Sequence, residues 1–473
     1  MSPEEDRAFL ELVREPAPPI AGPFALTDLG NAERLVAIHG QELRYAAGIG
    51  WLVWDGRRFR ADDTGEPLRR AKRTARAILH DAANCDDDDE RKRIVTWART
   101  SESEPRLRAM VSLAATEEAI VVRAQELDVD PRLLNVANGT IDLRTGEPRP
   151  HDRADLITKL APVAYQPDAH SDRWEQFLDR ITGGDKELAT FVQRLAGYTI
   201  TGLTDEEILA FPHGPGATGK STTVEAIKGV LGDYAATADF ETFLARRGDA
   251  GVRNDIARLA GARMVISLEV DDGKRLAEGL IKQLTGGDTV SARFLYSESF
   301  EYSPGFTLWL VANARPRVHA DDDALWRRIL QIPFVVVIPP EERDPELKRA
   351  FRSDPHEQTA ILAWLVKGCL DWQQQGLNVP ARVRDYTDAY RAENDPLTEW
   401  LTDECTLDPA KWTPGRTLRA NYETWCENSS TKPLDPGRPW GNALKAHGCD
   451  RKRHAKAHGW QGISLTNDPN DPK

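Results

Sequence analysis

The chain has 473 residues, which suggests about three domains because a single hydrophobic core seldom organises so long a chain. Its 40% hydrophobic content, its acidic N-terminus and the lack of a long apolar run exclude a signal peptide and a membrane span, so we expect a cytoplasmic protein with no membrane partner. The net charge of −13 excludes a surface covered with nucleic acid but allows a local basic patch, and the five cysteines lack the paired spacing of a disulfide framework or a four-cysteine zinc site.

The region before residue 200 indicates a tail followed by a mixed α+β domain. Residues 1–20 are acidic and rich in proline, as in tails without a core of their own. Residues 51–60 and 133–143 each contain two apolar runs joined by a glycine-containing turn, which predicts two β-hairpins. Residues 174–199 have the periodicity of helices.

A basic helix is expected at residues 68–80, shortly before the acidic run at residues 86–90. The helix could contact phosphate groups, but we favour a solvated face whose charge is balanced by the neighbouring acids. Adjacent carboxylates could also hold metal ions, yet no strand flanks the acidic run, so we interpret it as structural.

One segment fits the phosphate-binding pattern G-x-x-x-x-G-K-[ST], from Gly214 to Ser221. The pattern predicts a strand before it and a helix after it that ends at Gly232. Glycines let the backbone N–H groups turn toward an anion, and the helix N-terminus adds a positive end. Lys220 would meet the β- and γ-phosphates of ATP, and Ser221 would bind Mg²⁺. A fortuitous glycine-rich turn is the alternative. The expected ATP contacts in this segment are Gly214, Gly216, Gly219, Lys220, Ser221 and Thr222.

Two later strand patterns each end in a polar residue that suits ATP hydrolysis, with a hairpin expected between them at residues 289–302. The first ends near Glu269, which could hold Mg²⁺ through water or orient the attacking water. Asp271 and Asp272 are close enough in sequence to be alternatives to Glu269 for part of that task. The second ends at Asn313, which could position water beside the γ-phosphate or could be an ordinary turn residue.

Arg327 and Arg328 directly precede another apolar strand pattern. An arginine at this point is hard to accommodate in a core, whereas its planar guanidinium could reach the nucleotide of a neighbouring subunit. A surface ion pair is the alternative.

Helices expected at residues 347–376 would close this domain, and Pro380 begins another unit. Further helices, a basic arm and a final strand at residues 459–465 fit a winged-helix DNA-binding domain. A solvated basic loop is the alternative for the arm. Three histidines and one cysteine near the arm lack the paired cysteines of a common zinc site. The arm could contact DNA phosphates through Arg451, Lys452, Arg453 and Lys456.

From about residue 26 to residue 334, the order of these segments resembles the phage and plasmid primase-helicase family, whose ATPase is a superfamily 3 helicase and whose relatives include the poxvirus primase-helicase. Several motifs in one order are far more specific than a lone phosphate loop. The motifs are residues 27–34, 54–56, 134–146 and 196–198, the phosphate loop, Glu269, residues 282–288 and 292–293, Asn313 with Pro316, and residues 326–329 and 332–334.

The resemblance implies a role for each matching residue. Lys220 and Ser221 would bind ATP and Mg²⁺, Glu269 would be the Walker B acid and second Mg²⁺ contact, Asn313 the sensor, Arg328 the arginine finger and Arg327 its alternative.

By the same resemblance, Arg293 would lie near the nucleotide, and the turn at Tyr296 and Ser297 would point into the channel of a ring and contact DNA. The chain departs from the family at two places. Relatives usually have a lysine around Ser297, which leaves the DNA-tracking residue open, and Thr218 replaces the usual asparagine of the phosphate loop.

The fold class implied is α/β, with a P-loop ATPase core of the AAA+-like superfamily 3 helicase type, an α+β N-terminal domain and a C-terminal winged-helix-like domain. The expected divisions are a tail at 1–20, a helicase-associated domain at 21–160, the ATPase at 161–345, a helical lid at 346–380 and the winged-helix-like domain at 381–473.

The implied function is an ATP-dependent DNA helicase for phage or mobile-element replication in a bacterial host's cytoplasm. It would form a ring, most simply a homo-hexamer, on single-stranded or forked DNA and hydrolyse ATP with Mg²⁺ at subunit interfaces. We expect no primer-synthesis domain and therefore a separate primase. The alternative is a non-processive module that assembles on origin DNA with ATP but does not unwind it, and a small-molecule kinase is a weaker alternative.

Overall fold

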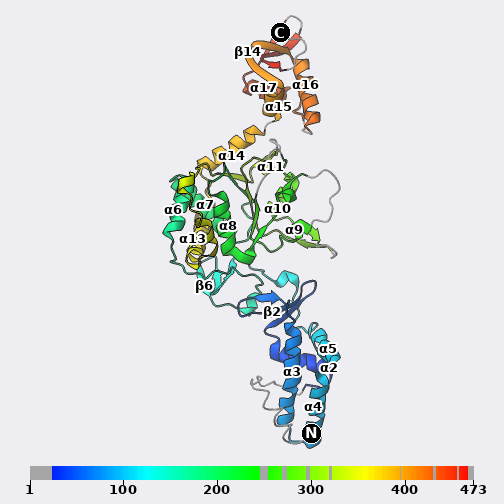
Figure 1. Ribbon diagram of the computed structural model, residues 1–473. Coiled ribbons are helices and arrows are strands. Elements are labelled where there is room, and N and C mark those ends of the chain that lie inside the picture. Colours follow the sequence, from blue (N-terminus) through cyan, green and yellow to red (C-terminus); the bar gives the residue numbers. More distant parts are fainter. Residues whose placement is uncertain are drawn as a thin grey trace. The chain divides into compact units, whose positions relative to one another are not determined.

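The computed structural model describes residues 24–245, 254–268, 274–293, 299–318, 322–394, 396–429, 433–454 and 457–466, with elements labelled as in Figure 1. The chain divides into two compact units. The first comprises the residues up to 171 together with 229–234 and 352–373, and the second comprises 172–228, 235–351 and the residues from 374 onward.

Residues 24–171 of the first unit combine helices with two small antiparallel sheets. Both predicted hairpins are confirmed, because Trp54 pairs with Phe59 and Val136 pairs with Gly139. The helices are α2 (Asp28–His39), α3 (Glu66–Ala83), α4 (Asp88–Ser101) and α5 (Glu104–Ala114). The sheets are β1 (Leu43–Ala46), β2 (Gly50–Trp54) and β3 (Phe59–Ala61), and β4 (Leu133–Val136), β5 (Gly139–Asp142) and β6 (Glu147–Arg149).

The acidic run begins α4, as its structural interpretation requires. Asp87 caps the helix by accepting hydrogen bonds from the backbone N–H groups of Asp89 and Glu90, which would otherwise lack partners. The following acids then pair with bases three residues later, as in the contact between Glu90 and Arg93 at 2.7 Å. The carboxylates therefore stabilise the N-terminus of their own helix.

The second unit is built on a parallel sheet of five strands. The strand order is β13 (Ile329–Pro333), β7 (Leu209–His213), β12 (Thr307–Val311), β9 (Met264–Leu268) and β8 (Ala235–Thr237). All adjacent pairs are parallel, so the carboxyl ends of these strands lie at one edge. The strands at the centre are almost wholly buried, which matches their near-continuous apolar sequences.

The helix after β7 is α8 (Lys220–Leu231), and it ends where predicted, since Gly232 has a left-handed backbone with φ +53°. The predicted hairpin at residues 289–302 is also confirmed, because Val290 pairs with Tyr302. The other elements around the sheet are α6 (Asp172–Thr182), α7 (Lys186–Thr199), α9 (Asn254–Ala257), α10 (Glu278–Thr285), β10 (Val290–Arg293), β11 (Ser299–Tyr302), α11 (Asp323–Trp326), α12 (Leu347–Ser353), α13 (Pro355–Gln375) and α14 (Ala381–Glu393).

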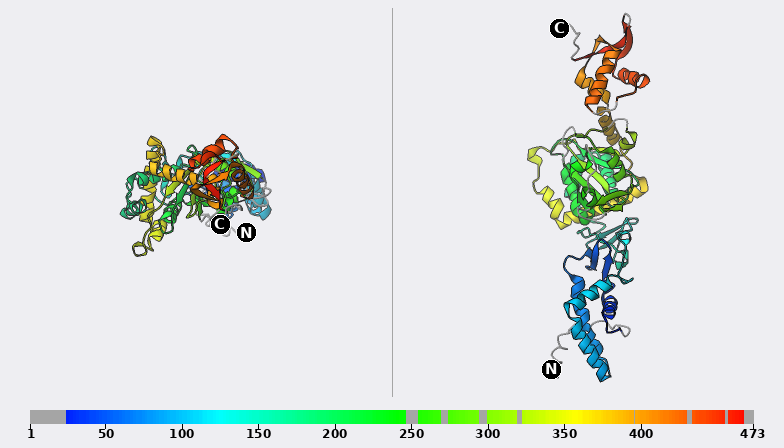
Figure 2. Two further views of the ribbon diagram at one scale, coloured as in Figure 1. Left: turned by 90° about the horizontal axis from the view of Figure 1, so that it is seen from above. Right: turned by 90° about the vertical axis from the view of Figure 1, so that its right-hand side faces the viewer.

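The C-terminal domain has its own core, in which the rings of Trp400, Tyr422 and Trp440 pack together. Its elements follow the order α15 (Pro396–Glu404), β14 (Cys405–Pro414), α16 (Gly415–Asn428), α17 (Arg438–Ala446), β15 (Asp450–His454) and β16 (Ala457–Leu465). The strands form an antiparallel sheet of order β14-β16-β15, and α16 contacts it, as can be followed in Figure 2. Most of the basic arm, residues 451–454, lies in strand β15. Strand β14 was not predicted from the sequence. Among the described helices, none is long and apolar enough to cross a membrane.

Candidate functional site

The candidate site lies at the carboxyl edge of the parallel sheet in the second unit. Strand β7 is paired with β13 on one side and with β12 on the other. The phosphate-loop pattern follows β7 directly, and Asn313 follows β12 by two residues. Ligands of open α/β sheets bind at this edge, where loops from neighbouring strands meet. Glu269, Asp271 and Asp272 follow β9 in the sequence but lie outside the described residues.

Two glycines of the loop occupy positions that a side chain would not fit. A Cβ on Gly214 would lie 1.9 Å from the carbonyl oxygen of Phe334, and a Cβ on Gly219 would lie 2.5 Å from a methyl group of Ile181. Gly219 also has φ +86°, and Ala217 has φ +60°. These left-handed conformations bend the loop tightly before α8 begins.

The bend leaves several backbone donors open. Within the described residues, the N–H groups of Gly216, Ala217, Thr218 and Gly219 donate no hydrogen bond to the protein. Because successive free N–H groups before a helix form an anion-binding concavity, the loop is built to accept an anion.

Lys220 occupies the centre of the loop and is only 6% exposed. Its ammonium donates hydrogen bonds to the carbonyl oxygens of Gly214 at 2.7 Å and Pro215 at 2.6 Å, and to the Thr218 hydroxyl at 3.1 Å. Burial lowers the pKa of Lys220 from 10.5 to about 8, because the charged form loses hydration. The Thr218 hydroxyl thus helps to hold the lysine ammonium in place.

A pocket of about 530 Å³ adjoins the loop, a size that suits a nucleotide. Its wall includes Ala217, Gly219 and Thr222 from the loop and the start of α8, and Phe177 and Ile338 supply apolar surface. The N–H of Ile338 donates to the carbonyl oxygen of Ala217 at 2.9 Å, which fixes this wall to the loop.

Charged side chains from α6 and from the segment before α12 cross the same pocket. Arg173 pairs with Asp344, and Arg180 pairs with Glu342. The Arg173 guanidinium and backbone N–H donors also lower the pKa of Asp344 below its ordinary value. These ion-paired groups line the pocket, so its wall carries charged as well as apolar side chains.

A group that the sequence analysis missed lies beside the loop. His213 ends β7, and its Nδ1 lies 3.0 Å from the hydroxyl of Tyr386 on α14. The pKa of His213 is lowered to about 4, first by burial and then by the charges of Arg315 and Lys220, while a hydrogen bond to the backbone of Asn313 opposes the shift. His213 is therefore neutral at physiological pH. No sequence signal pointed to it, since its partner is far away in the chain.

Of the two polar strand ends predicted from the sequence, Asn313 is the one that falls within the described residues, and it is exposed. Two residues later, Arg315 hydrogen-bonds Gln331 at 2.9 Å and lies over the ring of Tyr386. Arg315 thereby connects β12, β13 and α14 at the edge of the site.

The two candidate finger arginines differ in environment. Arg328 is 7% exposed, and it contacts Glu207 at 2.6 Å and the carbonyl oxygen of Ala324 at 2.6 Å. The Arg327 side chain is 67% exposed and contacts Glu207 only at 3.4 Å. Arg328 is thus held by contacts within its own chain, while the Arg327 side chain is more exposed and less restrained.

The remaining predicted residues are only partly described. The backbone of Arg293 is in β10, and its side chain lies outside the described residues, as do Tyr296, Ser297 and Lys456. Arg451, Lys452 and Arg453 are all exposed on β15.

Comparison with known proteins gives matches over both units. Residues 32–183 match the family model described as D5 N terminal like, and residues 213–328 match a family of unknown function, DUF5906. The chain is 28% identical over 298 residues to a protein of Acanthamoeba polyphaga mimivirus provisionally named helicase L207/L206, covering 59% of this chain and 31% of that one. These matches support a primase-helicase family for this chain.

Other relatives from large DNA viruses agree with this assignment. A protein of Frog virus 3 provisionally named helicase 022R is 28% identical over 284 residues, covering 57% of this chain and 28% of that one. An African swine fever virus protein provisionally named primase C962R is 23% identical over 312 residues, covering 60% of this chain and 32% of that one. The chain spans about a third of the length of these relatives.

Among solved structures, that of the NrS-1 C-terminal region (305-718) matches the chain with a TM-score of 0.39 and 12% identity, covering 67% of this chain and 88% of that one.

Proposed function

We propose that this primase-helicase family member is an ATP-dependent DNA helicase of phage or mobile-element replication, with a P-loop ATPase core of the superfamily 3 type. The observation that carries the proposal is the loop after β7, where consecutive N–H groups without a protein partner among the described residues directly precede Lys220 and its buried ammonium. The phosphates of ATP would accept hydrogen bonds from the loop N–H groups and from the Lys220 ammonium. Lys220 would then give up its hydrogen bonds to loop carbonyl oxygens and bond phosphate oxygens instead.

The other roles follow from position around this loop. Ser221, the second residue of α8, would bind Mg²⁺, and Glu269 would complete the metal site and orient water. Asn313, exposed at the same sheet edge, would sense the γ-phosphate. The adjoining pocket would take the adenosine, with Phe177 and Ile338 against the base.

Assembly and DNA contact complete the proposal. Arg328, or Arg327 with its freer side chain, would reach the nucleotide of the next subunit in a homo-hexameric ring. The order α15-β14-α16-α17-β15-β16 supports a winged-helix-like DNA-binding domain, whose exposed β15 cations would meet phosphates. Primer synthesis would come from a separate polypeptide or segment.

Two substitutions test the nucleotide site. Lys220→Ala should abolish ATP hydrolysis in a folded protein, because it removes the charge that meets the phosphates. Glu269→Gln should retain nucleotide binding and lose hydrolysis, since the carboxamide has nearly the same shape but is a poor base. Turnover would be followed by phosphate release and binding by a fluorescent ATP analogue.

Near-normal turnover of folded Lys220→Ala would exclude the phosphate-loop assignment. Strand displacement on forked DNA then separates a helicase from a module that only assembles on DNA. ATP-dependent binding without displacement by the wild-type protein would favour the assembly module.

A further inference from the structure

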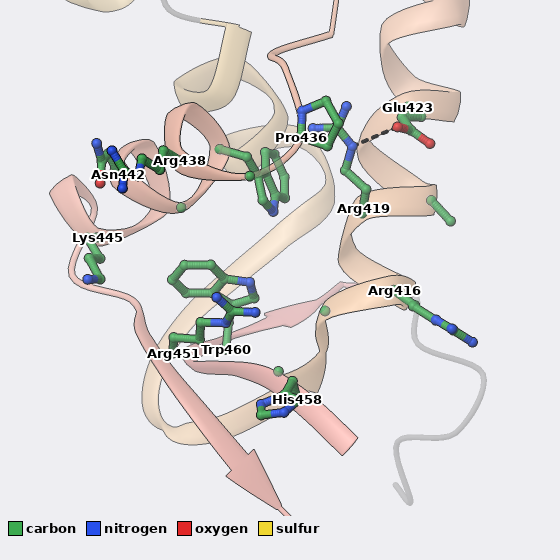
Figure 3. Close-up of a pocket in the computed structure, with 16 residues that line it drawn as sticks. Arg416, Arg419, Glu423, Pro436, Arg438, Asn442, Lys445, Arg451, His458 and Trp460 are labelled. Atoms are coloured by element: carbon green, nitrogen blue, oxygen red, sulfur yellow. Dashed lines mark hydrogen bonds and ion pairs between the residues drawn. The ribbon is translucent and has the colours of Figure 1, made fainter. Parts of the chain in front are cut away.

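The C-terminal domain gathers cations around a pocket of about 710 Å³ between α16, α17 and the β15–β16 pair (Figure 3). Five cationic side chains line the pocket: Arg416 and Arg419 of α16, Arg438 and Lys445 of α17, and Arg451 of β15. Arg419 is paired with Glu423 at 2.7 Å. Among the described residues, the other four have neither an ion pair nor a side-chain hydrogen bond, so their charge is available to an external anion.

Helix α17 presents a polar face whose direction is fixed by its buried face. Arg438, Asn442 and Lys445 are spaced by four and three residues, so they share one side of the helix, and all three are exposed. On the opposite side, the ring of Trp440 lies 4.7 Å from that of Tyr422 in the domain core. The helix therefore displays an amide between two cations and cannot rotate to hide them.

We propose that α17 enters the major groove of duplex DNA, where Asn442 reads base edges and the four unpaired cations hold phosphates on either side. An α-helix fits the major groove, and an asparagine amide can make two hydrogen bonds to adenine there. Arginine and lysine contacts to phosphates set the register of such a helix. The choice of DNA as partner rests on the proposed function.

The aromatic residues of the pocket favour a duplex over a single strand. Proteins that hold single strands stack bases on exposed aromatic rings. Trp440 and Trp460 both line the pocket, but each is only 6% exposed and is committed to the domain core. The surface thus offers cations, an amide and the exposed imidazole of His458 but no exposed indole for stacking, which favours groove recognition.

The arm identified from the sequence is one border of this surface. Arg451 lies on β15 and lines the pocket together with the α17 residues. Sequence specificity would come from α17, because phosphate contacts alone carry no sequence information.

The test uses the full chain without nucleotide. Binding to labelled duplex and single-stranded DNA is measured by anisotropy across salt concentrations, and preferred duplexes are selected from a random library. The double variant Arg438→Ala with Lys445→Ala should bind duplex at least tenfold more weakly, and its salt slope should fall by about two, since each lost phosphate contact removes about 0.9. Lys411→Ala, which removes a cation from β14 outside the pocket, is the matched control and should change neither quantity.

Asn442→Ala should keep its affinity for random duplex within about twofold and lose the adenine preference of the selected sequences. Equal affinity for single strands, an unaffected double variant, or a wild-type selection without sequence preference would each overturn the inference. Near-UV circular dichroism of the tryptophan cluster verifies folding, and Arg438→Gln with Lys445→Gln replaces the alanine pair if that pair unfolds. Strand displacement is measured separately, so a wild-type protein that selects a duplex sequence but does not unwind DNA would overturn the proposed function and leave this inference standing.

Discussion

At the scale of single residues, Lys220 carries the most direct chemical consequence. Its ammonium contacts neutral oxygen atoms of the loop, and burial lowers its pKa to about 8. Near pH 8 about half of the unliganded sites would therefore hold a neutral amine. A phosphate anion favours the charged form and raises the pKa again.

We therefore predict that ATP binding at pH 8 takes up a proton and that affinity falls as the pH rises through about 8. The fall follows because the lysine must be protonated to meet the phosphates. Isothermal calorimetry in two buffers with different ionisation enthalpies measures the uptake. Lys220→Ala should show none, and a wild-type binding enthalpy that is independent of the buffer would contradict the prediction.

The residues that could be predicted from the sequence are those whose role depends on local spacing. Gly214, Gly219 and Lys220 follow from one short pattern, and the loop has the backbone that this pattern requires. His213 could not be predicted, because its contact with Tyr386 joins residues 173 positions apart. Only the folding of α14 against β13 brings the two side chains together.

At the scale of elements, the phosphate loop offers a matched pair of glycines. Gly219 has a left-handed backbone, and an added Cβ would clash with Ile181, whereas a Cβ on Gly216 would meet no atom within 4 Å. Gly219→Ala should lower the free energy of unfolding by about 1–3 kcal/mol through strain and overpacking and should impair ATP binding. Gly216→Ala should change stability by less than about 0.5 kcal/mol. Urea denaturation measures both, and similar losses in the two variants would show that the glycines are not distinguished by packing.

Strand β14 shows why one element was missed. Its sequence contains Pro409 and ends at Pro414, and proline usually argues against a strand because it cannot donate to the ladder. The structure accommodates Pro409 in a bulge between Asp408 and Trp412. The pairing of β14 with β16 comes from a distant segment of the chain, and a local pattern does not contain that information.

At the scale of the whole molecule, the sequence order suggested consecutive domains, but the compact units are assembled from separate segments. Residues 229–234 and 352–373 belong with the N-terminal unit, although they follow the phosphate loop in the chain. These later segments join the N-terminal unit through contacts between residues far apart in the sequence. One example is the hydrogen bond from Gln373 to the carbonyl oxygen of Leu143 at 2.7 Å. Local composition and periodicity cannot indicate them.

The last prediction follows from the proposed ring and concerns residues from two neighbouring chains. If Arg328 supplies charge to a nucleotide held by Lys220 of the next subunit, its contribution depends on assembly. Arg328→Ala should bind ATP almost normally and hydrolyse it about 10³-fold more slowly. Because Arg328 is paired with Glu207 in its own chain, it must exchange that partner on assembly, and the more exposed Arg327 is tested in parallel.

Mixing Arg328→Ala with Lys220→Ala should then restore activity, since some interfaces in mixed rings combine an intact lysine with an intact arginine from different chains. The ATPase rate is measured across mixing ratios after subunit exchange has been verified, with each variant mixed with itself as the control. A finger that acts within its own chain cannot be rescued in this way, because each variant chain lacks one of the two groups. Rates that stay at the weighted sum of the separate variants would exclude Arg328 as a residue acting between subunits, and rescue of Arg327→Ala instead would transfer the role to the arginine with the freer side chain.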